Sequence, residues 1–180
     1  MTPDTTNPGA RRLPWRAFGW GAGGLFLLWP IAVGAPWSAG DFVFAGAMVG
    51  IVGTGVELAV RRGNSAFSLA AGLALGAALL SAWVPGAVGV IGSEDNAANI
   101  LYPAVALLAL LGAMAALFRP RGMALAMAAA ALAELLVPVA AWLLWPDVRA
   151  AILAPEVPLT ALFLTVLWAS AAWLFGKSAG

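Results

Sequence analysis

Apolar residues dominate this chain in six long runs, and short polar breaks separate the runs. A helix that crosses the hydrocarbon core of a bilayer needs about 20 predominantly apolar residues. Each run is close to that length or longer, so the pattern predicts six membrane-spanning helices, arranged as three antiparallel hairpins. The predicted spans are residues 17–35, 42–60, 66–91, 99–118, 122–145 and 157–175.

The predicted fold class is therefore an all-α membrane protein, with one six-helix transmembrane domain over residues 15–177. Residues 1–14 are polar and rich in Thr, Pro and Asn, and we expect a mobile tail there. Residues 178–180 form a second short tail. Arginines before an apolar run also occur in signal peptides, but this run exceeds the roughly 7–15 residues of a signal core. We therefore interpret it as a span.

The positive charges predict how the helices are oriented, because Lys and Arg favour the cytoplasmic side. With six spans, both termini lie on the same side as the second and fourth turns. That side carries eight of the nine Lys and Arg residues, and Arg149 is the exception. We therefore predict cytoplasmic termini in a bacterial inner membrane. The opposite side is acidic and carries Asp41, Glu94, Asp95, Asp147 and Glu156.

Tryptophans are expected near both membrane interfaces, as in aromatic belts. Four of them are predicted at the cytoplasmic interface: Trp15, Trp20, Trp168 and Trp173. The other five are predicted toward the opposite interface: Trp29, Trp37, Trp83, Trp142 and Trp145.

Composition excludes several classes of chemistry. The 180 residues are 63% apolar and 9% charged, far from the balance of a soluble domain. The chain has no Cys or His, which excludes disulfides, thiolate metal sites, His-ligated haem and a Ser-His-Asp triad. The only lysine is Lys177, so an interior Schiff base is not expected. No phosphate-binding glycine loop or nucleic-acid motif is present. We expect no cofactor, no nucleic-acid partner and no enzymatic activity.

Prolines recur in the odd-numbered spans at Pro30, Pro85 and Pro138, which are 55 and 53 residues apart. Three parallel helical hairpins would explain this spacing, and so would chance, because proline is common in membrane helices. A proline frees the carbonyl group four residues earlier. The freed carbonyls belong to Phe26, Ser81 and Glu134. They could line a polar crevice or pack against a partner.

Two GxxxG patterns predict close helix contacts, because small residues let helix backbones approach each other. Gly46 and Gly50 form one pair on the second span, and Gly72 and Gly76 form the other on the third. Together with the alanine-rich fourth and fifth spans, they favour a tight bundle over a wide pore.

Glu134 is the main candidate for a functional residue, because it lies near the middle of the fifth span. A charged side chain there costs about 2.5–3.5 kcal/mol on insertion scales, and burial favours the neutral acid. Such an acid could bind a proton or a cation. Alternatively, it is a protonated packing residue that hydrogen-bonds a neighbouring helix.

Glu57 lies four residues before Arg61 near the predicted cytoplasmic end of the second span. This spacing favours an ion pair on one helix face. Alternatively, Glu57 turns inward with Thr54 and extends a polar path from Glu134.

The most polar segment between spans is the predicted outer loop, residues 92–99. Asp95 or Asn96 is expected to cap the fourth helix. Alternatively, the loop offers hard oxygen ligands for Ca²⁺ or Mg²⁺, although its spacing matches no EF-hand. The candidate binding residues of this region are Glu94, Asp95, Asn96, Asn99 and the single tyrosine, Tyr102. Tyr102 could mark a binding crevice or belong to an interfacial belt.

Three segments carry a resemblance to known proteins: residues 91–99 (IGSEDNAAN), 40–45 (GDFVFA) and 118–123 (FRPRGM). Over residues 15–175 the chain resembles a group of small, uncharacterised proteobacterial inner-membrane proteins. This resemblance implies a bacterial inner-membrane location but no activity or catalytic residues. The hairpins are also similar to the SPW-repeat membrane family, which has two spans per repeat and a Pro-Trp step. Here Trp29 precedes Pro30, and Pro138 has no adjacent tryptophan.

These observations favour a non-enzymatic accessory or structural membrane protein that packs against itself or a larger membrane complex. The alternative is a small proton- or cation-coupled transporter or channel that uses Glu134. A membrane enzyme ranks last, because it would depend on carboxylate or metal chemistry in the outer loop.

Overall fold

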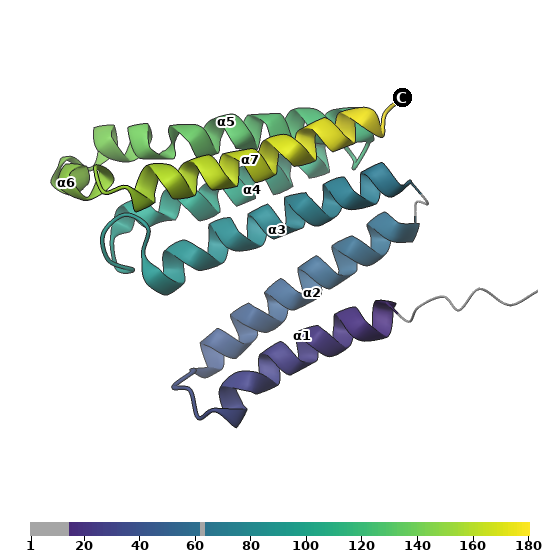
Figure 1. Ribbon diagram of the computed structural model, residues 1–180, viewed down its shortest axis with the longest axis horizontal. Helices are drawn as coiled ribbons and strands as arrows, with labels where there is room; N and C mark the ends of the chain where they lie inside the picture. The colour runs from purple at the N-terminus through teal and green to yellow at the C-terminus, as the bar shows by residue number, and fades with distance from the viewer. Residues whose placement is uncertain (1–14, 62–63) are drawn as a thin grey trace, which may run out of the picture. The chain divides into compact units, whose positions relative to one another are not determined.

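The computed structural model describes residues 15–61 and 64–180, and the tail predicted for residues 1–14 lies outside them. The described residues are helical, without strands (Figure 1). The long helices are α1 (Trp15–Ala32), α2 (Ala39–Arg61), α3 (Ser65–Val88), α4 (Leu101–Ala115), α5 (Pro120–Leu144) and α7 (Glu156–Lys177). The short elements are the 3₁₀ helices η1 (Ala97–Ile100) and η2 (Pro146–Val148), and α6 (Arg149–Ile152).

Five helical segments are long and apolar enough to cross a membrane: α2, α3, the joined η1–α4 segment, α5 and α7. The chain is thus a helical multi-pass membrane protein, as predicted. The first predicted span, residues 17–35, is not confirmed, because the apolar stretch of α1 covers only Ala17–Ala32. The sequence also did not predict the short helices η2 and α6 between α5 and α7. The orientation of the termini stays a prediction.

The chain divides into two compact units, residues 1–53 and 54–180, which are described separately below. The single domain over residues 15–177 therefore stays a prediction.

In the first unit, glycines allow α1 and the start of α2 to approach each other. A Cβ atom at Gly23 would lie 2.5 Å from the Val49 side chain, and one at Gly53 would lie 2.8 Å from the Trp20 ring. The turn between the helices ends in a capping box. The Asp41 carboxylate accepts hydrogen bonds from the Ser38 backbone N–H at 2.6 Å and from its hydroxyl at 2.9 Å. The Asp41 N–H donates back to Ser38 Oγ. Asp41 is thus accounted for by helix capping.

In the second unit, α3, α4, α5 and α7 form a four-helix bundle (Figure 1). Each of these helices packs against two of the others, so the four surround one core. The core is rich in alanine, which lets the helices lie close together. Its alanines include Ala70, Ala74 and Ala77 on α3, Ala109 and Ala113 on α4, Ala130 and Ala141 on α5, and Ala161 and Ala171 on α7.

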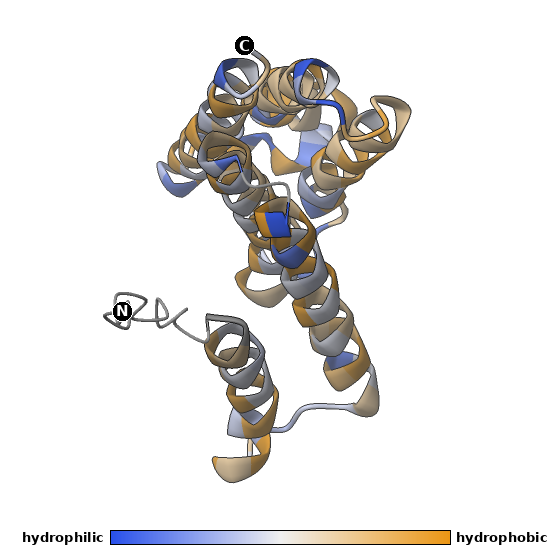
Figure 2. Cartoon of the chain, turned by 90° about the vertical axis from the view of Figure 1, so that its right-hand side faces the viewer, coloured by the Kyte–Doolittle hydropathy of each residue, from blue (hydrophilic) through white to orange (hydrophobic). Residues whose placement is uncertain are grey.

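Large apolar side chains point away from the bundle core, as a protein surrounded by lipid requires. Leu125, Leu143 and Leu159 are each more than 60% exposed in the isolated chain. Hydrophobic residues run along the length of the helices in Figure 2. The lipid-facing surface therefore accounts for much of the chain's apolar composition.

The glycines of the two GxxxG patterns make no close contact within their own units, because a Cβ at Gly46, Gly50, Gly72 or Gly76 would have no neighbour there within 4 Å. On α3 the reason is the helical repeat. The buried positions on α3 follow the stripe of Ala70, Ala74, Ala77, Ser81 and Pro85. Positions 72 and 76 lie about 200° around the helix from positions 70 and 74, at 100° per residue. The close approaches in the bundle occur instead at Gly112 and Gly122, against Ala126 and Ala116.

Candidate functional site

Glu134 lies inside the four-helix bundle, and none of its surface is exposed. It belongs to the buried stripe of α5, one turn after Ala130, one turn before Val137 and two turns before Ala141. The helical repeat of this alanine-rich stripe turns the carboxyl group toward the core. The prediction of a deeply buried acid in the fifth predicted span is confirmed.

Ser81 of α3 donates a hydrogen bond from its hydroxyl to Glu134 Oε2, at 3.3 Å. Ser81 is also completely buried. Both residues stand four positions before a proline inside their helices, Pro85 in α3 and Pro138 in α5. The proline pattern thus predicted that the backbone carbonyls of both residues are freed. That their side chains bond to each other is a result of the tertiary structure.

Tyr102 of α4 and Trp168 of α7 complete the group around the carboxyl, and they are 0% and 1% exposed. The Trp168 indole N–H approaches the carboxyl of Glu134 without reaching strict hydrogen-bond geometry. The Tyr102 hydroxyl lies within electrostatic range of the same carboxyl. We call Ser81, Tyr102, Glu134 and Trp168 the Glu134 cluster. Each of the four bundle helices contributes one member.

The Glu134 cluster contains one carboxyl group and three neutral partners, and every partner can donate a hydrogen bond. No charged residue is present in α3 or α4. The basic residues of the other two bundle helices are near helix ends, with Arg121 in the first turn of α5 and Lys177 as the last residue of α7. The chemistry open to the cluster is therefore hydrogen bonding and the exchange of a proton at the carboxyl.

Two aromatic residues were misplaced by the sequence interpretation. Trp168 was predicted at the cytoplasmic interface, and Tyr102 fitted an interfacial belt, yet both are buried in the bundle core. In α7 the buried stripe runs through Ala161, Leu164, Trp168 and Ala171. The helical spacing of these residues could have indicated that they share one face of α7. Because α7 is apolar on all sides, the sequence did not show which face is buried.

Asn99 supports the loop between α3 and η1 and is buried there. Its Oδ1 atom accepts hydrogen bonds from the backbone N–H groups of Val90 at 3.1 Å and Ile91 at 2.9 Å. Its Nδ2 atom donates to the Ser93 carbonyl at 2.8 Å. The loop also depends on Gly89, which has a φ of +67° and whose added Cβ would overlap the backbone of Ser93. Asn99 is therefore a structural residue of the loop.

Asn96 caps η1, because its Oδ1 accepts a hydrogen bond from the Ala98 N–H at 3.0 Å. Asn96 is thus a helix cap, as predicted, but of the 3₁₀ helix that leads into α4, and α4 itself has no side-chain cap. Glu94 and Asp95 are exposed. Within the described residues, no three acidic, His or Cys side chains come together as a metal-binding group. The alternative of a Ca²⁺ or Mg²⁺ site in this loop stays a prediction.

Glu57 forms the predicted ion pair with Arg61, with 2.8 Å between Oε1 and Nη2. The pair joins consecutive turns at the C-terminal end of α2. Thr54 is exposed. The observed role of Glu57 is thus structural pairing on its own helix.

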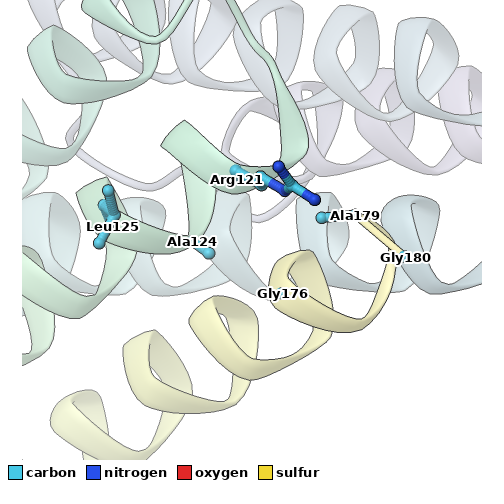
Figure 3. Close-up of a pocket in the computed structure, with 6 residues that line it drawn as sticks. All are labelled: Arg121, Ala124, Leu125, Gly176, Ala179 and Gly180. Atoms are coloured by element: carbon cyan, nitrogen blue, oxygen red, sulfur yellow. The ribbon is translucent and has the colours of Figure 1, made fainter.

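An open pocket of about 470 Å³ lies where the start of α5 meets the end of α7 (Figure 3). It is lined by Arg121, Ala124, Leu125, Gly176, Ala179 and Gly180. Arg121 is the charged side chain among these lining residues. The pocket is separate from the Glu134 cluster, because the two share no residue.

Comparison of the chain with protein-family models, with curated proteins and with solved structures finds no match. The function of the chain is therefore inferred from its own residues.

Proposed function

We propose that this chain is a non-enzymatic, structural or accessory protein of a bacterial inner membrane, which packs against itself or a larger membrane complex. The observation that carries this proposal is the complete enclosure of Glu134 by the chain's own helices. A buried carboxyl that hydrogen-bonds a neighbouring helix favours one arrangement of the helices over others. In this function Glu134 stabilises the bundle that presents the lipid-facing surface to a partner.

The second support is the position of Gly72 and Gly76 on α3. A Cβ atom at either position would have no neighbour within 4 Å, and both glycines lie outside the buried stripe of their helix. A GxxxG strip without a neighbour in its own unit lets a helix of another subunit approach closely. We therefore propose that this strip of α3 contributes to packing against a partner.

The proposed orientation places both termini in the cytoplasm, since that side carries eight of the nine positive charges. Fusion of alkaline phosphatase, which is active only in the periplasm, to the C-terminus tests the orientation. We expect an inactive fusion, whereas an active one would contradict the proposed topology.

Native mass spectrometry of the protein from its own membrane, in mild detergent, tests the accessory function. We expect a fixed stoichiometry, either with a larger complex or as a defined homo-oligomer, and Glu134→Gln should retain it. Leucine replaces one glycine in each of two matched variants. Gly72→Leu should weaken the assembly, and Gly176→Leu on α7, where a Cβ also meets nothing within 4 Å, should not. A monomer that co-purifies with no other subunit would contradict the proposal.

A small proton- or cation-coupled transporter or channel is the second candidate function. It is favoured by three buried polar atoms of the Glu134 cluster that have no hydrogen-bond partner among the described residues: Tyr102 Oη, Glu134 Oε1 and Trp168 Nε1. Proteoliposomes that contain a pH-sensitive dye test this function. Proton flux that disappears in Glu134→Gln would support it, while equal flux in protein-containing and empty vesicles would contradict it.

A further inference from the structure

The polar atoms of the Glu134 cluster that lack partners are close together in the bundle. Tyr102 Oη, Glu134 Oε1 and Trp168 Nε1 are all buried, and none has a hydrogen-bond partner among the described residues. They come from α4, α5 and α7. The Trp168 N–H approaches the Glu134 carboxyl, and the Tyr102 hydroxyl interacts electrostatically with it, so both groups lie near that carboxyl.

The hydrogen-bonding capacities of these atoms complement one another. The Trp168 N–H can only donate, an ionised carboxylate oxygen can only accept, and the Tyr102 hydroxyl can do either. None of the three reaches strict hydrogen-bond geometry with another, so a small molecule that bonds to all three would satisfy them. A buried water typically makes about three hydrogen bonds to polar groups that otherwise lack partners.

We propose that Tyr102, Glu134 and Trp168 together bind one water molecule in the core of the bundle. The water accepts from the Trp168 N–H and donates to Glu134 Oε1, and its second hydrogen reaches the Tyr102 hydroxyl. Ser81 is not part of this site, because it already donates to the other carboxylate oxygen, Oε2.

Other small ligands fit these atoms less well. A Ca²⁺ or Mg²⁺ ion takes six or more oxygen ligands, whereas Trp168 presents a hydrogen-bond donor that repels a cation. An anion would meet the Glu134 carboxylate. Water is compatible with all three groups because it both donates and accepts hydrogen bonds.

The water also gives the carboxyl a hydrogen-bond partner in both protonation states, because it can donate to the carboxylate or accept from the acid. Tyr102 is the titratable group that faces Glu134 from α4, and α3 has none. The charged residues of α5 and α7 other than Glu134 are Arg121, Glu156 and Lys177, near the helix ends. Proton exchange at this site would therefore pass through the water. The inference does not depend on the accessory function or on any partner.

Nuclear magnetic resonance of the full chain in detergent micelles, labelled with ¹⁵N-tryptophan, tests the proposal. The missing indole peak in Trp168→Phe assigns the resonance. We expect a cross-peak between the Trp168 indole proton and water, although the ring is 1% exposed. Tyr102→Phe should reduce this cross-peak several-fold, because it removes one partner of the water. Ser81→Ala is the matched control and should leave the cross-peak intact, since it removes a hydroxyl from the opposite carboxyl oxygen.

Absence of the wild-type cross-peak would overturn the proposal, and so would equal intensity in Tyr102→Phe and Ser81→Ala. If Tyr102→Phe does not fold, Glu134→Gln serves in its place, because the amide keeps the volume but changes the hydrogen bonds, and it should shift the Trp168 indole resonance. A crystal structure that resolves ordered waters is an independent measurement. One water bonded to the three side chains would support the proposal, and direct bonds among them would overturn it.

Discussion

The loop around Asn99 and the Glu134 cluster are both buried polar regions of the same unit, but their hydrogen bonds differ. Asn99 has both ends of its amide bonded to the backbone. The Glu134 cluster has one hydrogen bond between its members and three polar atoms without partners among the described residues. Satisfied polar groups serve the fold, and groups with spare capacity are where binding is expected. The comparison assigns a structural role to the loop and makes the cluster the region where a small bound molecule is expected.

Substitution of Asn99 should have the largest effect on stability. Asn99→Ala leaves the buried N–H groups of Val90 and Ile91 without their acceptor. At about 1–3 kcal/mol for each group, we expect a loss of about 2–6 kcal/mol. Unfolding in a detergent series, followed by circular dichroism, measures it. Asn96→Ala is the control and should cost only about 0.5–2 kcal/mol, because it removes a helix cap. Equal losses in the two variants would contradict the assigned role of Asn99.

Substitution of Gly89 tests whether the loop depends on its backbone conformation. Gly89→Ala puts a side chain at a φ of +67° and against the backbone of Ser93. Strain of this kind costs about 1–3 kcal/mol, and the thermal midpoint should fall accordingly. Gly86→Ala in α3 is the matched control, because a Cβ there meets nothing within 4 Å. If both variants had the same thermal midpoint, the loop would be less constrained than its geometry indicates.

Ser81 tests the single hydrogen bond of the cluster. Ser81→Ala should cost about 0.5–1.5 kcal/mol, the usual net contribution of such a bond. In a double-mutant cycle with Glu134→Leu, the same interaction should appear as coupling between the two sites. Thr165→Val removes a longer contact, 3.5 Å from the Ala131 carbonyl, and should cost less than Ser81→Ala. Additive effects of Ser81→Ala and Glu134→Leu would show that the hydrogen bond is not formed in the membrane.

The Glu57–Arg61 pair should have the smallest effect, because ion pairs one turn apart on a helix contribute about 0.3–0.5 kcal/mol. Glu57→Gln should lower stability by that amount in low salt and by less in high salt, as measured by thermal unfolding at two ionic strengths. A loss above about 1 kcal/mol, independent of salt, would instead place Glu57 in a buried network comparable to the Glu134 cluster.

Periodicity and charge determined much of what is known about this chain. Runs of apolar residues predicted helices close to α2, α3, α5 and α7, because a membrane span is defined by length and composition. The i,i+4 spacing predicted the Glu57–Arg61 pair, and the Asn96 cap followed from side-chain chemistry near a helix start. These features are local, so neighbouring residues alone can specify them.

The tertiary structure decided which side of each apolar helix is buried. In a soluble helix a polar face would reveal the buried one, but helices in lipid are apolar all round. For this reason Trp168 and Tyr102 were assigned to the wrong surroundings, and the GxxxG glycines were assigned contacts that they do not make within their own units. The Glu134 cluster draws on four helices, and its members lie up to 87 positions apart along the chain. Only the packing of those helices could bring Ser81, Tyr102 and Trp168 to the one acid that the sequence had singled out.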